Sequence, residues 1–262
     1  MSRDDTSPPE APTPSHLKRD PLRSALLPRE RLTPQDRDDM WALLDQYYEQ
    51  VTRAQFDADL DKKTHVILLR SRRTRALKGF STLVGRQMET AGRRWWMVFS
   101  GDTVIDRAYW GQQALQRRFT RYMLTQRLLH PTQPVYWLLI SKGYKTYLLM
   151  TRNFVEHWPR HDRPTPPWER AATDHAAAEL FGDAYDPAAG LLRFTGGQRL
   201  REGVAPPEDY RGDAPDGLFF LARNPRHARG DELVCLAPVS ASFVLNFTLR
   251  TLLKALGLRP RR

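Results

Sequence analysis

Two aspartates lie at the end of an apolar stretch, and they are the first candidates for a chemical role. Asp102 lies within the apolar run at residues 95–105, and Asp106 follows the run directly. If the run forms a strand, a carboxyl group inside it is buried, and burial raises its pKa. Asp102 is therefore the better candidate of the two. The alternative for Asp102 is a structural role, in which its carboxylate pairs with one of the many arginines or caps a turn.

A glycine follows these aspartates where a helix is expected to begin. Residues 106–110 are expected to form a turn, and residues 111–130 have an amphipathic helical pattern, so Gly111 stands at the predicted helix start. The first turn of a helix has free N–H groups and carries the positive end of the helix dipole. This turn is therefore the place where a phosphate-bearing ligand is expected to bind.

Strands and helices in alternation must position these residues. The pattern predicts helices from Pro34 and over residues 52–60, a hairpin at 66–69 and 76–84 with a basic turn at 70–75, a strand at 93–105, the helix at 111–130, a strand at 135–140 and a helix at 144–153. Thr33 is the expected cap of the first helix, with Pro34 at its first position. This order predicts an α/β fold.

The two ends of the chain differ from its middle. Residues 1–31 are rich in proline and charge and are expected to be a flexible tail. Beyond residue 159 we expect a helix at 168–181 and short strands at 191–194, 218–222 and 233–236. Residues 240–262 are apolar with a basic end, which predicts an amphipathic helix that lies on a membrane surface or docks on the sheet. The folded domain would then span residues 32–239.

Composition narrows the classes of partner. The 262 residues carry a formal net charge of +11, which favours an anionic partner such as a polyphosphate cofactor or an anionic membrane surface. Nucleic acid is not favoured, because the arginines are dispersed and no recognised nucleic-acid motif is present. The single cysteine, Cys235, lies in an apolar run and excludes an intramolecular disulfide. His157 and His161 have no further ligand at a suitable spacing, so no metal is expected. No signal peptide and no membrane-spanning run is predicted.

The order of elements and the turn at residues 106–115 resemble the GNAT superfamily of acyl-CoA-dependent N-acyltransferases. The phosphate-binding turn of that family reads (Gln/Arg)-x-x-Gly-x-(Gly/Ala), often after a tyrosine. Tyr109 and Gly111 match it, whereas Trp110, Gln113 and Leu115 depart from it. The resemblance covers roughly half of the chain. It implies a GNAT-like central mixed β-sheet flanked by helices, with a C-terminal extension that ends in the amphipathic helix. The cofactor-binding residues that it implies are Val104, Ile105, Arg107, Tyr109, Trp110, Gly111, Gln112, Gln113 and Ala114.

The resemblance also suggests catalytic roles. The general base of the family is usually a carboxylate, or a water held by one, near the fourth strand, which points to Asp102. The tyrosine that protonates the departing thiolate in the family would fall at Leu149 here, so the usual acid is absent from its usual place. Tyr144 or Tyr147 could replace it, with Ser141 nearby, or these tyrosines serve only in packing.

The predicted function is therefore the transfer of an acyl group from acyl-CoA, or from an acidic acyl carrier protein, to a primary amine. Such a reaction needs a held donor, a neutral amine, oxyanion stabilisation and a proton for the thiolate, but no metal. The apolar strands and the basic surface favour a lipidic amine such as a sphingoid base or an amino-lipid. The expected location is cytoplasmic, with peripheral binding to the inner face of the membrane as an option. The alternative is a GNAT-shaped ligand- or membrane-binding protein without catalysis.

Overall fold

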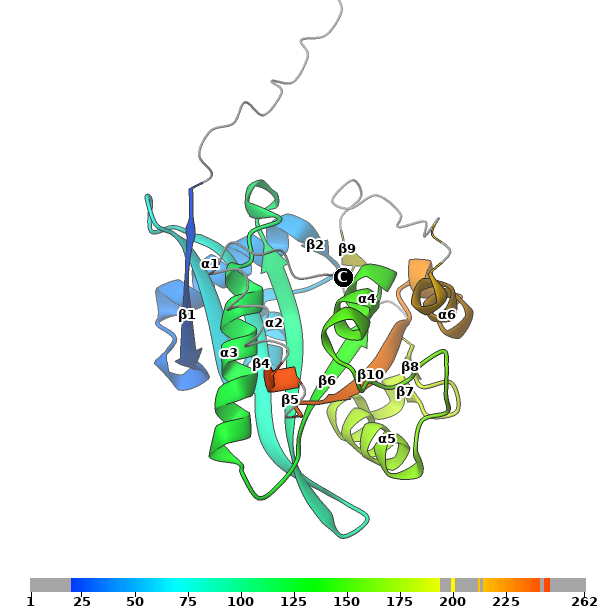
Figure 1. Cartoon of the computed structure of the whole chain (residues 1–262). Helices are drawn as coiled ribbons and strands as arrows, with labels where there is room; N and C mark the ends of the chain where they lie inside the picture. The colour runs from blue at the N-terminus through cyan, green and yellow to red at the C-terminus, as the bar shows by residue number, and fades with distance from the viewer. Residues whose placement is uncertain (1–19, 194–198, 201–211, 213, 241–242, 246–262) are drawn as a thin grey trace, which may run out of the picture.

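The computed structural model describes residues 20–193, 199–200, 212, 214–240 and 243–245. Within these residues eight strands form one sheet in the order β1-β3-β4-β5-β6-β10-β8-β7, and β2 pairs separately with β9 (Figure 1). The strands are β1 (Leu22–Pro28), β2 (Tyr48–Glu49), β3 (His65–Ser71), β4 (Leu77–Thr90), β5 (Arg93–Ile105), β6 (Val135–Ser141), β7 (Tyr185–Asp186), β8 (Leu191–Leu192), β9 (Arg199–Leu200) and β10 (Glu232–Pro238). The helices are α1 (Pro34–Tyr47), α2 (Arg53–Asp61), α3 (Ala114–Leu129), α4 (Tyr144–Asn153), α5 (Pro167–Phe181) and α6 (Pro215–Arg223).

The main sheet is mixed. The strand pairs in it are antiparallel except β5 and β6, which run parallel and are joined through α3. A parallel pair needs a crossover connection, and a helix is the usual one. The predicted α/β fold, a central mixed sheet flanked by helices, is confirmed.

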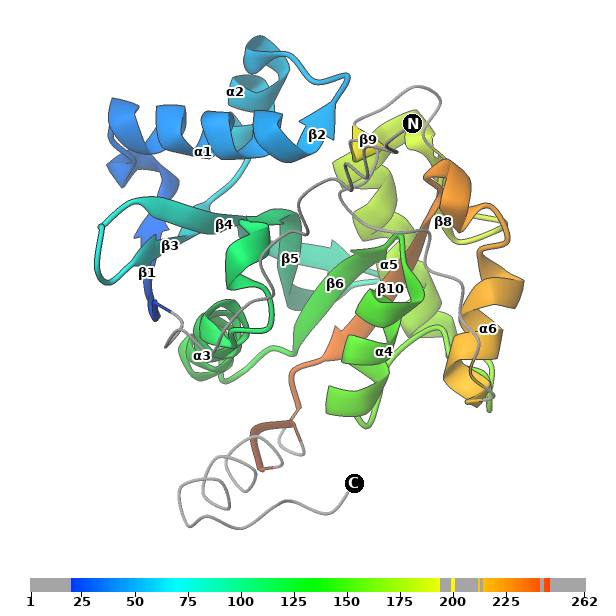
Figure 2. The same cartoon turned by 90° about the horizontal axis from the view of Figure 1, so that it is seen from above.

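Helices cover both faces of the sheet, as Figure 2 shows from above. In the centre of β5 the side chains alternate between the faces, because successive residues of a strand point to opposite sides. Val98 packs with residues of α3 and α4. Met97 and Phe99 pack with alanines of α5 on the opposite face. On the same face as α5, helices α1 and α2 cover β3 and β4 around Phe80.

Local sequence signals explain where the first two helices begin. The Thr33 hydroxyl accepts from the Asp36 amide, and the Asp36 carboxylate accepts in return from the Thr33 amide. Thr52 and Gln55 form the same reciprocal arrangement at α2. Each pair satisfies N–H groups that a helix start leaves without intrahelical partners. The predicted cap at Thr33, with Pro34 as the first helical residue, is confirmed.

Three expectations need correction. The expected tail through residue 31 is wrong for Leu22–Pro28, which forms edge strand β1 against β3. The expected strand at residues 218–222 is helix α6, with Pro215 at its start. An apolar run this short does not show whether its side chains repeat as in a helix or as in a strand. Pro215 was therefore the better signal, because proline is common at the first positions of a helix. Helix α3 begins at Ala114 rather than at Gly111. Residues 1–19 and most of residues 240–262 lie outside the described residues.

Candidate functional site

Strands β5 and β6 part where the predicted catalytic residues lie. They pair only from Trp96 and Val135 to Phe99 and Leu138, whereas β5 remains paired with β4 as far as Ile105. Among the described residues, the edge of β5 over residues 100–105 therefore has no strand partner on the β6 side. We call residues 100–105 of β5 and 139–141 of β6 the strand fork. Asp102 and Ser141 each lie three residues beyond the last pair, on opposite arms of the fork.

A bulge and a buried indole accompany the fork. Ser81 pairs with Thr103 and Leu83 with Ser100, so Gly101 and Asp102 together oppose the single residue Thr82. Such a bulge bends a strand and increases its twist. From the paired part of β6, the indole N–H of Trp137 donates to Ser100 Oγ, just past the last backbone pair, at 3.1 Å. A side-chain hydrogen bond thus joins β5 and β6 at the point where their backbone pairing ends.

The turn after β5 is held firmly by residues far away in sequence. The Asp106 carboxylate accepts from Lys78 Nζ at 3.0 Å and from the Ala108 amide at 3.0 Å. The Tyr47 hydroxyl accepts from the Arg107 amide at 2.9 Å. The Lys78 ammonium lies 5.5 Å from the centre of the Tyr109 ring. Asp106 therefore has a structural role in shaping the turn.

Two predicted cofactor residues instead tie the turn to β1. The Gln112 side chain accepts from the Leu22 amide at 3.1 Å and donates to the Asp20 carbonyl at 3.0 Å. The Tyr109 hydroxyl donates to the Asp20 carboxylate at 3.1 Å. Burial and this acceptor together raise the pKa of Tyr109. Both side chains thus support the turn, which leaves its backbone as the part available to a ligand.

The start of α3 has the features expected of an anion-binding turn. Gly111 has φ of +83°, in the left-handed region that favours glycine, and it is exposed. Gln113 is the N-cap of α3 and makes no side-chain capping hydrogen bond. Exposed Arg107 and Arg117 lie on either side of this point in the chain. Arg118 is not available, because its guanidinium donates to Ser24 of β1.

The other predicted cofactor residues have mixed placements. The Trp110 indole N–H donates to the Ile105 carbonyl at 2.8 Å, and the residue is 42% exposed. Val104 points into the core beneath α1 and α2, so only its backbone faces the fork. The side chain of Ala114 is buried against the sheet on the α3 face. The turn therefore offers mainly backbone groups.

Asp102 lies among ionisable groups that come from four other elements or their ends. Lys63, just after α2, places Nζ 4.0 Å from the Asp102 carboxylate. Burial and the neighbouring Asp102 raise the pKa of Glu232, the first residue of β10, while Lys142 opposes this shift from 3.3 Å. Burial and these two carboxylates raise the pKa of Tyr48 to about 12. Perturbed ionisable groups that gather in this way are typical of functional sites.

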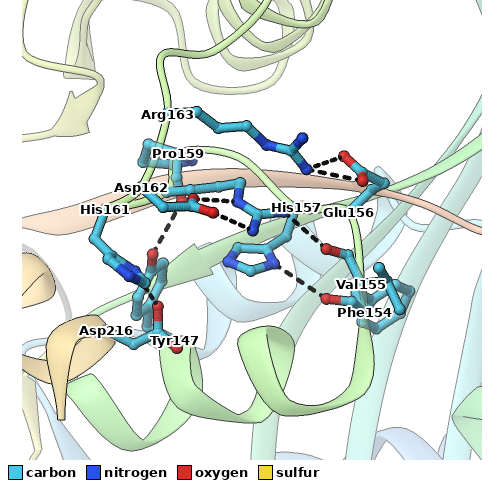
Figure 3. Close-up of polar contacts among 11 residues, drawn as sticks. Tyr147, Phe154, Val155, Glu156, His157, Pro159, His161, Asp162, Arg163 and Asp216 are labelled. Atoms are coloured by element: carbon cyan, nitrogen blue, oxygen red, sulfur yellow. Dashed lines mark hydrogen bonds and ion pairs between the residues drawn. The ribbon is translucent and has the colours of Figure 1, made fainter.

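Ser141 and Tyr147 have structural partners. Ser141 is fully buried, and its hydroxyl donates to the Gly143 carbonyl at 2.9 Å in the turn before α4. Tyr147 is also fully buried, and its hydroxyl donates to the Pro159 carbonyl at 2.9 Å (Figure 3). The Tyr147 hydroxyl is thus engaged by the loop at residues 154–163. Tyr144, the first residue of α4, remains half-buried.

The structure brings forward residues that the sequence analysis did not select. Glu232, Tyr48, Lys63 and Thr82 gather with Asp102 although they are far apart along the chain. The only local signal was the charged start of the apolar run at residues 232–238, at Glu232.

Among the described residues no group of His, Cys, Asp and Glu could hold a metal ion. No helix in the same residues has the length and apolar character needed to cross a bilayer.

No family model and no curated protein matches the chain. Solved structures do match. A protein of unknown function from Enterococcus faecalis, described as a probable N-acyltransferase, is 14% identical with a TM-score of 0.38, over 50% of this chain and 32% of that one. A GNAT family N-acetyltransferase from Escherichia coli in complex with CoA is 15% identical with a TM-score of 0.36, over 52% and 71% of the two chains. An acyl-CoA N-acyltransferase from Pseudomonas aeruginosa is 16% identical with a TM-score of 0.37, over 51% and 88%.

These likenesses concern about half of the chain and the fold alone. The TM-scores lie between 0.36 and 0.38, so these structures are what half of the chain is similar to and carry no conclusion about its family or activity. Activity, substrates and partners of this chain are therefore proposed from its own site.

Proposed function

We propose that the protein is an N-acyltransferase that moves an acyl group from acyl-CoA to a primary amine. The observation that supports this most is the strand fork beside the uncapped start of α3. An extended chain with amide groups can pair with an unpaired strand edge as an added strand does. The pantetheine arm of CoA is such a chain, and residues 100–105 offer that edge.

The phosphates of CoA would then lie at the turn of residues 106–113. The first-turn N–H groups of α3 and the positive end of its dipole favour an anion there. Exposed Gly111 lets the phosphates approach the backbone, and exposed Arg107 and Arg117 add positive charge. Tyr109 and Gln112 act indirectly, by holding the turn against β1.

The reaction at the fork would be direct acyl transfer. The amine nitrogen attacks the thioester carbonyl carbon, the new C–N bond forms, and the C–S bond breaks. Asp102 accepts the proton that the amine loses, and Tyr144 supplies a proton to the thiolate. Asp102 suits this role because it lies at the bulge, on one arm of the fork, and its side chain is 33% exposed.

The finer parts of the prediction remain proposals. A lipidic amine, such as a sphingoid base or an amino-lipid, is supported by the apolar strands and by exposed Leu128 and Leu129 at the end of α3. An acidic acyl carrier protein as the donor, and an anionic membrane surface on the cytoplasmic side, are supported by the net charge of +11.

One contact favours the second candidate, a GNAT-shaped binding protein without catalysis. The Trp110 indole already donates to the Ile105 carbonyl, at the end of the edge that a pantetheine arm would use. A bound donor would have to displace this contact or end short of it.

The test is a thiol-release assay with acetyl-CoA and long-chain acyl-CoA against a panel of primary amines. Thermal unfolding with each CoA ester measures donor binding in the same samples. An acyltransferase releases thiol only when an amine is present, and CoA esters raise its melting temperature. A thermal shift without turnover supports the binding protein, and neither signal would reject both.

A further inference from the structure

Charges of both signs meet at the bulge of β5. The Lys63 side chain is only 14% exposed, and its ammonium lies 4.0 Å from the Asp102 carboxylate. That ion pair is too long for a hydrogen bond. The same ammonium lies 5.7 Å from the centre of the Phe99 ring. Among the described residues, Asp102 is the only carboxylate within ion-pair distance of Lys63.

Gly101 and Thr82 explain how Lys63 comes so close to the strand. A Cβ on Gly101 would lie 3.2 Å from Lys63 Nζ and 2.6 Å from Thr82 Oγ1, so both polar atoms occupy the side of Gly101 that a side chain would fill. Thr82 is 1% exposed, and its hydroxyl has no hydrogen-bond partner among the described residues. A buried hydroxyl without a partner is costly. The absence of a side chain at Gly101 leaves room for both this hydroxyl and the Lys63 ammonium beside the strand.

A second carboxylate, Glu232, interacts electrostatically with Asp102. Glu232 is 13% exposed, and its pKa is raised mainly by burial and in smaller part by the charge of Asp102. Lys142 balances part of this charge from 3.3 Å, and its own side chain is 40% exposed. An ammonium group bound at Asp102 would reduce the repulsion between the two carboxylates.

An acceptor whose only ionisable group is its amine would leave the Lys63 ammonium without a carboxylate partner. When Asp102 binds the incoming amine or takes its proton, the Lys63 ammonium loses its carboxylate partner while it stays largely buried. A buried charge without a partner is strongly unfavourable. A carboxylate on the acceptor, close to its amine, would replace Asp102 as the partner of Lys63.

We infer that the acceptor is an α-amino acid, whose carboxylate pairs with Lys63 and whose amine lies at Asp102. The inference rests on the proposed acyltransferase function and narrows its acceptor. The short distance between Lys63 and Asp102 suits an amine and a carboxylate on one carbon. A sphingoid base has no carboxylate and would not satisfy Lys63.

The test compares α-amino acids with their amides, which keep the amine and lose the negative charge. Thiol release from acyl-CoA is measured for each pair, with sphinganine as a third acceptor. We expect kcat/KM to be roughly 10-fold or more higher for the acid than for its amide, because the amide leaves Lys63 unpaired. Lys63→Met should abolish that preference, and Lys63→Arg should keep much of it. Lys62→Met is the matched control, since exposed Lys62 pairs with Asp59.

Calorimetric titration of the acid and the amide, without donor, separates this inference from the proposed function. If no acceptor gives turnover, the acyltransferase proposal fails, while preferential binding of the acid that Lys63→Met removes still supports the amino-acid site. Equal use and equal binding of acid and amide by the wild type overturns the inference. A preference that survives in folded Lys63→Met overturns it as well.

Discussion

Asp102 and Glu232 are two carboxylates of one site with different surroundings. Asp102 lies at a bulge on one arm of the strand fork, where its side chain is 33% exposed. Glu232 is more deeply buried, one strand beyond the other arm, and burial raises its pKa. In the proposed reaction the more accessible Asp102 exchanges the proton with the substrate, and the buried Glu232 acts only through its charge.

Replacing Asp102 tests the proton transfer. Asp102→Asn should lower turnover by roughly 100-fold or more, because an amide cannot accept the amine proton. Donor binding should change less, and the loss should shrink at high pH, where more of the amine is already neutral. Steady-state kinetics over a pH series measures this. Asp59→Asn, at an exposed carboxylate outside the fork, should behave as wild type. Unchanged turnover in Asp102→Asn would mean that Asp102 is not the general base and that another carboxylate accepts the amine proton.

Three histidines link folding stability to pH. Burial lowers the pKa of His157, His65 and His130 below the ordinary value of 6.5. His157 lies in the loop of Figure 3, where Nδ1 lies 3.1 Å from the Phe154 carbonyl and Nε2 is buried without a hydrogen-bond partner in the described part of the chain. Above pH 6.5 both the folded and the unfolded state are neutral at these rings. Below it the unfolded state binds protons first, so the free energy of unfolding should fall as the pH falls.

Denaturant unfolding between neutral and mildly acidic pH measures this slope. His157→Gln should reduce the slope, since it removes one of the three groups, whatever it does to the stability at neutral pH. His175 provides the control, because it lies on the surface of α5 with a half-exposed side chain. An unchanged slope in His157→Gln would mean that this ring does not contribute.

At the scale of elements, the start of α3 and the edge of β5 form one unit. The turn between them is fastened to α1 through Tyr47, to β4 through Lys78 and to β1 through Gln112. These contacts from three elements hold the backbone that the phosphates would meet. The turn should therefore resist local change better than an isolated loop, and a substitution on its exposed side should affect binding more than folding.

Gly111→Trp tests that unit. A large side chain at the exposed glycine would occupy the phosphate position, so binding of CoA esters should be lost while the protein remains folded. The positive φ of Gly111 adds strain in any variant, and this must be controlled. Gly92→Trp carries similar strain at φ of +72°, in the open β4–β5 turn, and should keep donor binding. Calorimetry with acyl-CoA compares the two. Equal affinities in the two folded variants would contradict the site.

At the scale of the whole molecule, the net charge and the C-terminal segment bear on membrane binding. Lys and Arg near an anionic surface contribute about 1 kcal/mol each. The structure places the start of the segment in the core, because Phe243 is 5% exposed and stacks on Phe154 with 4.4 Å between the ring centres. A truncation should therefore begin after Leu245.

The predicted outcome is reversible binding to anionic liposomes that weakens with salt. Removal of residues 246–262 should keep the thermal unfolding transition and reduce binding, if these residues supply the membrane contact. Sedimentation with anionic and with neutral vesicles measures both effects. Equal binding of the folded truncated protein would assign the contact to the basic surface of the domain. Unfolding on truncation would place the segment in the core.

Local patterns in the sequence were sufficient for most elements before residue 190. Thr33 and Thr52 carry complete capping signals, and the long strand β5 alternates between two apolar faces. Such signals act over a few residues, so they can be read without the fold. They failed at β1, whose conformation depends on its pairing with β3. They also failed at α6, where the apolar run is too short to show the repeat of a helix.

The site depended on the tertiary structure. The sequence indicated Asp102 and the turn at Gly111, because a carboxyl in an apolar run and a glycine before a helix are visible locally. Nothing in the order of residues showed that β5 and β6 separate after Phe99, that Gly101 and Asp102 form a bulge, or that Lys63 and Glu232 reach the same carboxylate. Strand register and burial arise from contacts between distant segments, and charges interact through space, so only the folded chain brings these groups together.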